Sequence, residues 1–154
     1  KFTKNFQMDN KIQKIIVSGI ILNENKEVLL AQRPLHKKIA PGAYHIPGGH
    51  VEFGETAEGA IIREILEEFN LNITPREVLR TFSYIIDNSH TIGITFNLSA
   101  NGDVRNIKFN KQDTESIVWV DNNTMDRYLK NTDHDYITLK EFFKKIKICQ
   151  LSKK

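Results

Sequence analysis

Several features that would assign this chain to a particular class of protein are scarce or missing. It has one cysteine, Cys149, so an internal disulfide is excluded and a reducing cytoplasm is the expected compartment. No apolar run approaches the roughly 18 residues that a membrane-spanning helix requires; the longest, residues 15–22, has the length of a strand. The first 14 residues are polar and lysine-rich, without the apolar segment of a signal peptide. We therefore expect a protein that is neither secreted nor bound to a membrane.

The sequence also lacks a basic body, although its formal net charge is +3. The two ends, residues 1–14 and 140–154, hold ten of the 22 basic residues but only two of the 19 acidic ones. The body between them is left with 12 basic and 17 acidic residues. An acidic body repels a phosphate backbone but suits a divalent cation. We expect no stable nucleic-acid binding, with the terminal lysines forming solvated tails and a solvated helix face.

The order of hydrophobic patterns predicts one α/β domain with a mixed sheet in residues 11–154, after a flexible leader in residues 1–10. Met8 is a candidate natural start, which would make residues 1–7 an addition. Apolar and β-branched runs predict strands over residues 15–22, 28–32, 44–46, 77–86, 91–99 and 116–120. The first strand is expected to be buried on both faces and to form a hairpin with the second. Helical periodicity predicts helices over residues 56–69 and 135–148.

The first predicted helix carries an unusual cluster of carboxylates. Thr56 is a suitable N-cap, and Asn70 tolerates the left-handed conformation found just past many helix ends. The apolar stripe consists of Ala57, Ala60, Ile61, Ile65 and Leu66. On a helix, residues at i, i+3 and i+4 share a face, and this spacing belongs to Glu64, Glu67 and Glu68.

Stacked carboxylates repel one another by about 0.2–0.5 kcal/mol per pair, so the cluster is unfavourable unless something neutralises it. A hard divalent cation with oxygen ligands would do so. Taken alone, such a cluster is more often a solvated acidic face. The preceding loop favours the cation, because Gly48 and Gly49 let the backbone pass close to the helix and turn a carbonyl towards the same ion. Glu55 and Arg63 are placed to pair across the turn and brace the loop against the helix.

This segment resembles the Nudix box, which runs Gly, five residues, Glu, seven residues, Arg-Glu, an aliphatic, any residue, Glu-Glu, any residue, Gly, an aliphatic. The matching positions are Gly49, Glu55, Arg63, Glu64, Ile65, Glu67, Glu68 and Leu71, with every spacing kept. The single departure is Asn70 in place of glycine. Because Asn is the next-best left-handed residue, the helix end is expected to survive.

The resemblance implies a Nudix-type α/β/α sandwich and Mg²⁺-dependent attack of water on a phosphorus, with Mn²⁺ as a substitute ion. It implies that Glu67 and Glu68 are metal ligands and that Glu64 is a ligand or the base for the attacking water. The backbone carbonyl of Gly48 would add a further ligand. Arg63 belongs to the implied catalytic set, while Gly49 and Glu55 shape the site.

Outside the box, the resemblance adds two charged residues to the candidate site. Glu115 stands before the last strand, where family members often carry a further catalytic Glu, although Asp113 is an equally near alternative. Arg33 ends the second strand, where a basic residue often faces the substrate phosphates. Either could instead be an ordinary surface charge. His36, His45 and His50 are not expected to bind Mg²⁺, which prefers oxygen. Aromatic side chains that could stack on a base, but are core residues more often, are Tyr84, Phe96 and Trp119.

The loop over residues 40–55 resembles that of MutT-like nucleoside-triphosphate diphosphatases, which release a nucleoside monophosphate and pyrophosphate. The expected partner is therefore a small nucleotide, modified or oxidised bases included, and the expected protein is a monomer or homodimer. The alternative within the family is a hydrolase of nucleoside-diphosphate sugars such as ADP-ribose, or of dinucleoside polyphosphates. Two other classes were weighed: a Nudix-like ligand sensor, which would not need an intact carboxylate set, and a nucleic-acid-binding protein using the lysine-rich ends.

Overall fold

The structure of the protein is a computed structural model that describes residues 11–151, with side chains described to residue 148. The first five elements along the chain are β1 (Ile12–Ile20), β2 (Val28–Gln32), β3 (Tyr44–His45), β4 (Gly48–His50) and α1 (Ala57–Phe69). They are followed by β5 (Ile73–Ile86), β6 (Ser89–Ala100), β7 (Ser116–Val120), the 3-10 turn η1 (Met125–Arg127) and α2 (His134–Leu151). The predicted leader lies outside the described residues, and the single domain over residues 11–154 stays a prediction. None of the helices in the described part of the chain is long and apolar enough to span a membrane.

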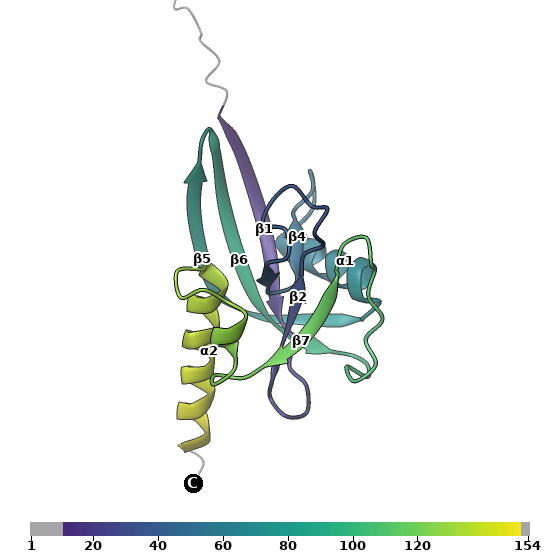
Figure 1. Ribbon diagram of the computed structural model, residues 1–154, viewed down its shortest axis with the longest axis vertical. Coiled ribbons are helices and arrows are strands. Elements are labelled where there is room, and N and C mark those ends of the chain that lie inside the picture. The colour runs from purple at the N-terminus through teal and green to yellow at the C-terminus, as the bar shows by residue number, and fades with distance from the viewer. Residues whose placement is uncertain (1–10, 152–154) are drawn as a thin grey trace, which may run out of the picture.

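The described strands form two sheets with a helix on either side (Figure 1). The larger has the order β4-β1-β6-β5, in which β1 runs parallel to β6 and antiparallel to β4. The smaller has the order β3-β2-β7 and is antiparallel. The predicted α/β class and mixed sheet are therefore confirmed.

The predicted hairpin between the first two strands is present only next to its turn. Leu22 and Val28 form an isolated antiparallel bridge, flanked by backbone hydrogen bonds from the Asn23 N–H to the Glu27 carbonyl and from the Leu29 N–H to the Ile21 carbonyl. The partner of β1 is instead β6, in a parallel ladder that runs from Ile12 opposite Ser89 to Ile20 opposite Asn97. A long ladder between distant segments makes more backbone hydrogen bonds than the short turn could offer, and the local turn signal does not reveal it.

The second half of β1 and the whole of β2 contribute to the cores on both faces, as β2 shows most clearly. Val28 and Leu30 point into one core, whereas Leu29 and Ala31 point into the other, because successive side chains of a strand face opposite sides. The core that receives Leu29 and Ala31, called the first core below, is closed by α1 through Ala60, Ile61, Ile65 and Phe69. The second is closed by α2 through Leu139 and Phe142. Leu66, expected on the buried stripe of α1, is instead 43% exposed, and Phe69 lies on the buried face.

The upper part of the larger sheet projects beyond the helices (Figure 1). The hairpin of β5 and β6 is longer than predicted at its strand ends and turns through Asp87, whose φ is 52°. The first half of β1 accompanies it, so Ile12 is 56% exposed and Ile15 is 41% exposed, contrary to the expectation of burial throughout. These segments form the outer wall of the cleft described below.

Candidate active site

The first helix begins and ends as its sequence predicts, and this fixes the phase of its carboxylates. The Thr56 side chain accepts a hydrogen bond of 3.0 Å from the Gly59 N–H at the start of α1. At the other end, Asn70 adopts the left-handed conformation with φ 48° and ψ 37°, and its N–H bonds to the Leu66 carbonyl. Asn70 therefore does what glycine would do at this position.

Gly49 lies directly against Glu64, and Gly48 lies against the backbone of β1. Gly48–His50 forms the short strand β4, antiparallel to β1, rather than an irregular bend. A Cβ on Gly49 would overlap the Glu64 carboxyl group, and a Cβ on Gly48 would overlap the Val17 carbonyl oxygen. Because Gly49 lacks a side chain, the carboxylate of Glu64 can approach the β4 backbone and remain only 16% exposed.

Glu68 shares the cleft with Glu64 and shows the electrostatic strain of that position. Burial raises the pKa of Glu68 to about 8, and the nearby carboxylates of Glu64 and Asp113 act in the same direction. The positive charges of Lys37 and Arg33 oppose the shift without cancelling it. A carboxyl group that keeps its proton near neutral pH would be stabilised in its charged form by a bound cation.

The third carboxylate of the predicted cluster does not converge with the other two. The Glu67 side chain is 61% exposed, does not line the cleft, and receives only a 3.3 Å hydrogen bond from Arg63. Consistently, no group of three His, Cys, Asp or Glu side chains within the described residues is arranged to hold a metal ion. The structure thus brings Glu64 and Glu68 together, and the role of Glu67 stays a prediction.

Arg63 links the loop before α1 to the carboxylates on it. Its Nε and Nη2 donate to the two oxygens of Glu55 at 2.9 and 3.0 Å, the paired geometry in which guanidinium and carboxylate bind most strongly. Its Nη1 donates to Glu64 at 3.0 Å, and Nη2 also reaches the His50 carbonyl at 3.0 Å. The Arg63 guanidinium lowers the pKa of Glu55 below its ordinary value. The geometry matches the bracing contact expected between Glu55 and Arg63.

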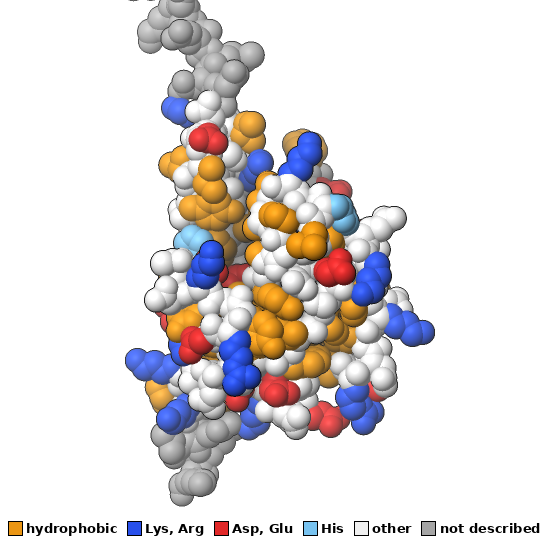
Figure 2. Space-filling view, in the orientation of Figure 1, with side chains coloured by type: hydrophobic (Ala, Val, Ile, Leu, Met, Phe, Trp, Pro, Cys, Tyr) orange, Lys and Arg blue, Asp and Glu red, His pale blue; other side chains and the backbone are white. Residues whose placement is uncertain are grey.

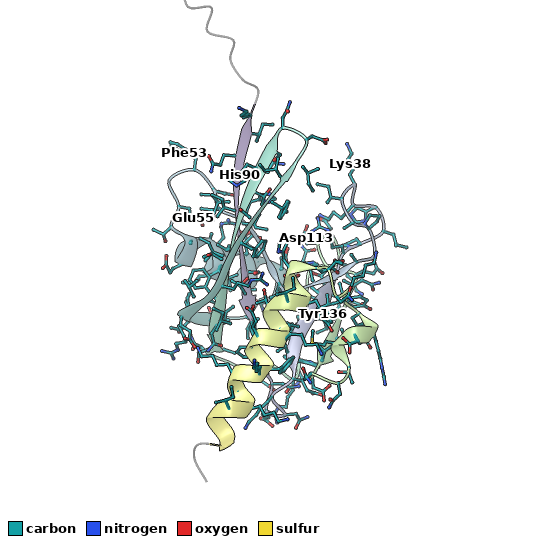
Figure 3. All side chains as sticks on the ribbon, turned by 90° about the vertical axis from the view of Figure 1, so that its left-hand side faces the viewer. Lys38, Phe53, Glu55, His90, Asp113 and Tyr136 are labelled. Atoms are coloured by element: carbon teal, nitrogen blue, oxygen red, sulfur yellow. The ribbon has the colours of Figure 1, made fainter. Side chains whose placement is uncertain are left out.

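The positive charges of Arg33 and Lys37 lie near Glu68. Arg33 lines the cleft and is held by a 3.0 Å hydrogen bond from its Nε to the Ile39 carbonyl. Lys37 bonds to Asp113 at 2.9 Å. Glu115 is exposed and does not line the cleft, whereas Asp113 acts on Glu68, so the structure places the alternative carboxylate nearer to the candidate site. In Figure 3, Glu55 lies towards the left edge of the molecule, whereas Asp113 lies nearer its middle, below the loop that contains Lys38.

The cleft has a volume of about 710 Å³ and extends from Glu64 and Glu68 to the tip of the β5–β6 hairpin. Sequence reasoning missed Asp135, whose carboxylate accepts a 2.9 Å hydrogen bond from the Ile46 N–H at the inner end of the cleft. Burial raises the pKa of Asp135 to about 6. No local pattern marks this residue, since it comes into the site only when α2 packs against the sheet. His45 also lines the cleft, and burial lowers its pKa, which keeps the ring neutral.

An aromatic wall stands beside Asp135. The rings of Phe82 and His134 are stacked with centroids 4.3 Å apart, and Tyr84 stacks on His134 at 5.6 Å. Phe82 and Tyr84 line the cleft. Of the three aromatic residues considered from the sequence, Tyr84 is therefore at the cleft, whereas Phe96 is buried and Trp119 packs against the first core.

The oxygen donors around Glu64 and Glu68 fit a hard divalent cation. Glu64 and Glu68 offer carboxylate oxygens, and neighbouring positions on β4 bear no side chain that would obstruct an approach to its backbone. Oxygen donors favour Mg²⁺ or Mn²⁺ over softer metals. The raised pKa of Glu68 is the second sign, because a positive charge bound there would relieve the repulsion between the two carboxylates.

Comparison with known proteins points in the same direction. The family profile described as NUDIX domain matches residues 13–142. The chain is 34% identical over 83 residues to an 8-oxo-dGTP diphosphatase from Proteus vulgaris, covering 54% of this chain and 73% of that protein. It is 43% identical over 61 residues to an 8-oxo-dGTP diphosphatase from Escherichia coli, covering 40% and 45%. It is 37% identical over 90 residues to an ADP-ribose pyrophosphatase from Methanocaldococcus jannaschii, covering 57% and 52%. The latter two matches span about half of those relatives.

Solved structures share the fold. A MutT protein from Methanosarcina mazei Go1 superposes with a TM-score of 0.74 at 22% identity, covering 90% of this chain and 97% of that one. The ORF135 protein of E. coli gives a TM-score of 0.70 at 22% identity, covering 86% and 89%. At these identities the likeness concerns the architecture.

Proposed function

This chain belongs to the Nudix family and is a Nudix hydrolase acting on nucleotide diphosphate linkages, and we propose that its substrate is a nucleoside triphosphate, modified or oxidised bases included. The products would be a nucleoside monophosphate and pyrophosphate, and the metal would be Mg²⁺. The observation that carries the proposal is one cleft in which Glu64 and Glu68 face Arg33. Such a cleft combines anionic oxygens for a cation with a positive charge for phosphates.

In this proposal, Glu64, Glu68 and the Gly48 carbonyl hold the ion, and Glu67 joins them only by leaving Arg63. A bound divalent cation supplies charge neutralisation at the phosphates and lowers the pKa of water. Arg33 holds phosphate oxygens by charge-assisted hydrogen bonds. Glu64 accepts the proton of the attacking water; the water oxygen bonds to phosphorus while the bridging P–O bond breaks and its electrons leave with pyrophosphate.

The nucleoside would occupy the part of the cleft near Asp135. Phe82 and Tyr84 provide an apolar and aromatic wall there, and Asp135 is fixed by the Ile46 amide. With its pKa raised to about 6, the Asp135 carboxyl can donate as well as accept a hydrogen bond near that pH. This favours a ligand with a polar base edge over a purely apolar one.

A second candidate is hydrolysis of ADP-ribose or another nucleoside diphosphate linked to a second group. The ADP-ribose pyrophosphatase match covers more of this chain than either 8-oxo-dGTP diphosphatase match. The cleft, at about 710 Å³, also continues past the inner end to residues Ile12 and Ile86. Two relatives named for 8-oxo-dGTP leave the triphosphate as the first choice.

The test is product analysis over a panel of unmodified, oxidised and methylated nucleoside triphosphates, ADP-ribose and dinucleoside polyphosphates, with Mg²⁺, Mn²⁺ or a chelator. We expect pyrophosphate with a nucleoside monophosphate, loss of turnover in chelator, and loss of turnover in Glu68→Gln. Release of a sugar phosphate from ADP-ribose at higher kcat/KM would establish the second candidate instead. Hydrolysis that is insensitive to chelator, or to Glu68→Gln, would contradict the site assignment.

A further inference from the structure

A second hollow lies at the other end of the molecule, where α2 passes the turn between β1 and β2 (Figure 1). We call it the lysine groove; its volume is about 630 Å³, and its lining consists of Lys26, Asp121, Asn122, Asn123, Lys140, Phe143, Lys144, Ile146 and Lys147. It shares no lining residue with the active-site cleft. Figure 2 shows several Lys and Arg side chains in the lower part of the molecule, with Asp and Glu side chains between them.

The lysines of this groove keep most of their charge unpaired. Among the described residues, no carboxylate lies within ion-pair distance of Lys26, Lys144 or Lys147. Lys140 has only a long contact of 3.9 Å with Asp126. On the same helix, Lys145 lies outside the groove and pairs with Glu77 at 3.0 Å.

Two acidic residues at or near the groove accept hydrogen bonds from their own loops. Asp121 accepts hydrogen bonds from the Thr124 hydroxyl and from the N–H groups of Asn123 and Thr124, and the Thr124 hydroxyl contributes most to lowering its pKa. Glu27 accepts a 2.7 Å hydrogen bond from the Asn23 side chain, within the turn that presents Lys26. The groove is therefore positive overall, because its lining holds four lysines and one carboxylate, that of Asp121.

The floor of the groove is apolar, which a binding site for a simple anion would not need. Phe143 and Ile146 are half-buried against the second core and form part of the lining. Asn122 and Asn123 are exposed at the rim and add amide donors and acceptors. Positive charges for a phosphate backbone beside an aromatic ring for bases are the two elements of single-strand recognition.

The spacing of the lysines suits consecutive phosphates. Lys140, Lys144 and Lys147 fall at i, i+4 and i+7, one face of α2, and extend over about 10 Å of helix axis at about 1.5 Å per residue. A stacked strand presents a phosphate about every 3.4 Å, so about three phosphates fit this length. We propose that the lysine groove binds a short segment of single-stranded nucleic acid, with RNA as the probe, independently of the hydrolytic site. Such binding is weak and salt-sensitive, and so differs from the stable nucleic-acid binding that the sequence disfavours.

Fluorescence anisotropy of a 12-nucleotide RNA with a 5′-hydroxyl and a 3′-fluorophore tests the proposal, in chelator and with the full chain. This RNA contains no diphosphate linkage, so the proposed hydrolysis cannot consume it. With three phosphates neutralised, log K against log salt should have a slope of about −2, a roughly 20-fold loss of affinity from 50 to 200 mM KCl. Absence of binding at 50 mM KCl would overturn the proposal.

Matched variants locate the site. Lys144→Glu with Lys147→Glu should weaken binding at least tenfold, flatten the salt slope, and leave nucleotide hydrolysis unchanged. The control, Lys145→Glu with Lys108→Glu, has the same change in net charge outside the groove and should weaken binding less than about threefold. Equal weakening by both pairs would show an effect of net charge alone and refute the groove.

Two further arms separate RNA from other polyanions. Phe143→Leu keeps the apolar volume but removes the ring, so affinity should fall about fivefold or more with an unchanged salt slope. A 12-residue polyglutamate and inorganic tripolyphosphate should compete only at much higher concentration than RNA. Competition by polyglutamate at equal concentration would assign the groove to acidic peptides, and equal competition by tripolyphosphate would reduce it to a phosphate site. Because Glu68→Gln should still bind RNA, failure here and failure of the proposed hydrolysis remain distinguishable.

Discussion

Replacing Glu68 by Gln should have opposite effects on stability and activity. Glu68 is a buried carboxyl whose pKa is about 8 instead of 4.5, through burial and then the charges of Glu64 and Asp113. In metal-free protein at pH 7 the unfolded chain releases this proton and the folded chain keeps it. At about 1.36 kcal/mol per pKa unit, the interval from 4.5 to 7 gives a ceiling of about 3 kcal/mol by which the carboxyl disfavours folding.

The direction of the pKa shift of Glu68 determines the pH range in which stability changes. Because the folded pKa is raised, the contribution of Glu68 to stability is fully present below about pH 4.5 and is lost as the pH rises through about 8. The Gln side chain keeps the size and removes the ionisation, but it must still satisfy its amide. We expect chelator-treated Glu68→Gln at pH 7 to gain about 1–2 kcal/mol, or roughly 2–8 °C in Tm, while kcat with Mg²⁺ falls by about two orders of magnitude or more.

Thermal denaturation of both proteins in chelator from pH 4 to 8 gives the measurement, and pyrophosphate release with Mg²⁺ gives the activity. Glu67→Gln is the matched control, because its 61% exposed carboxylate touches only Arg63, and an exposed pair of this kind contributes about 0.3–0.5 kcal/mol. A Tm difference between wild type and Glu68→Gln that stays constant across this window would refute the electrostatic account. Retention of full activity by Glu68→Gln would refute its role in the site.

Three further changes test the surroundings of the site. Gly49→Ala places a Cβ on the Glu64 carboxyl group, so it should cost about 1–3 kcal/mol in chemical denaturation and lower kcat as well; unchanged turnover would contradict the close packing. Arg63→Lys cannot reproduce the paired bonds to Glu55, and we expect a loss of about 1–2 kcal/mol and a roughly tenfold fall in kcat/KM, whereas wild-type kinetics would exclude a bracing role. Asp135 has its pKa raised to about 6, so its stabilising contribution is present below 3.8 and lost as the pH rises through 6; Asp135→Asn should flatten both the stability and the KM profiles between pH 4 and 7, and parallel profiles would count against a substrate contact.

The sequence predicted the ends of the first helix and the bounds of the last strand. The helix over residues 57–69 has the Thr56 cap and the left-handed Asn70 that the sequence indicates, because both are set by side chains within one turn of the helix ends. The strand over residues 116–120 is likewise found at its predicted bounds. The hairpin between the first two strands is limited to the residues next to its turn, because the longer pairing of β1 is decided by the partners available in the whole fold, and the turn at residues 23–26 carries no information about β6.

The candidate site also has features that the sequence predicts and features that depend on the tertiary structure. The sequence by itself determined that Glu64, Glu67 and Glu68 share one side of a helix, because the helical period fixes their phase. Only the tertiary structure decided which of them face the cleft. Glu64 lies against Gly49 of β4 and lines the cleft together with Glu68, whereas Glu67 remains exposed to solvent beside Arg63. The same holds for Asp135, which has no motif and reaches the cleft only when α2 docks on the sheet. Helical period is a property of neighbouring residues, whereas exposure depends on what the rest of the chain places nearby.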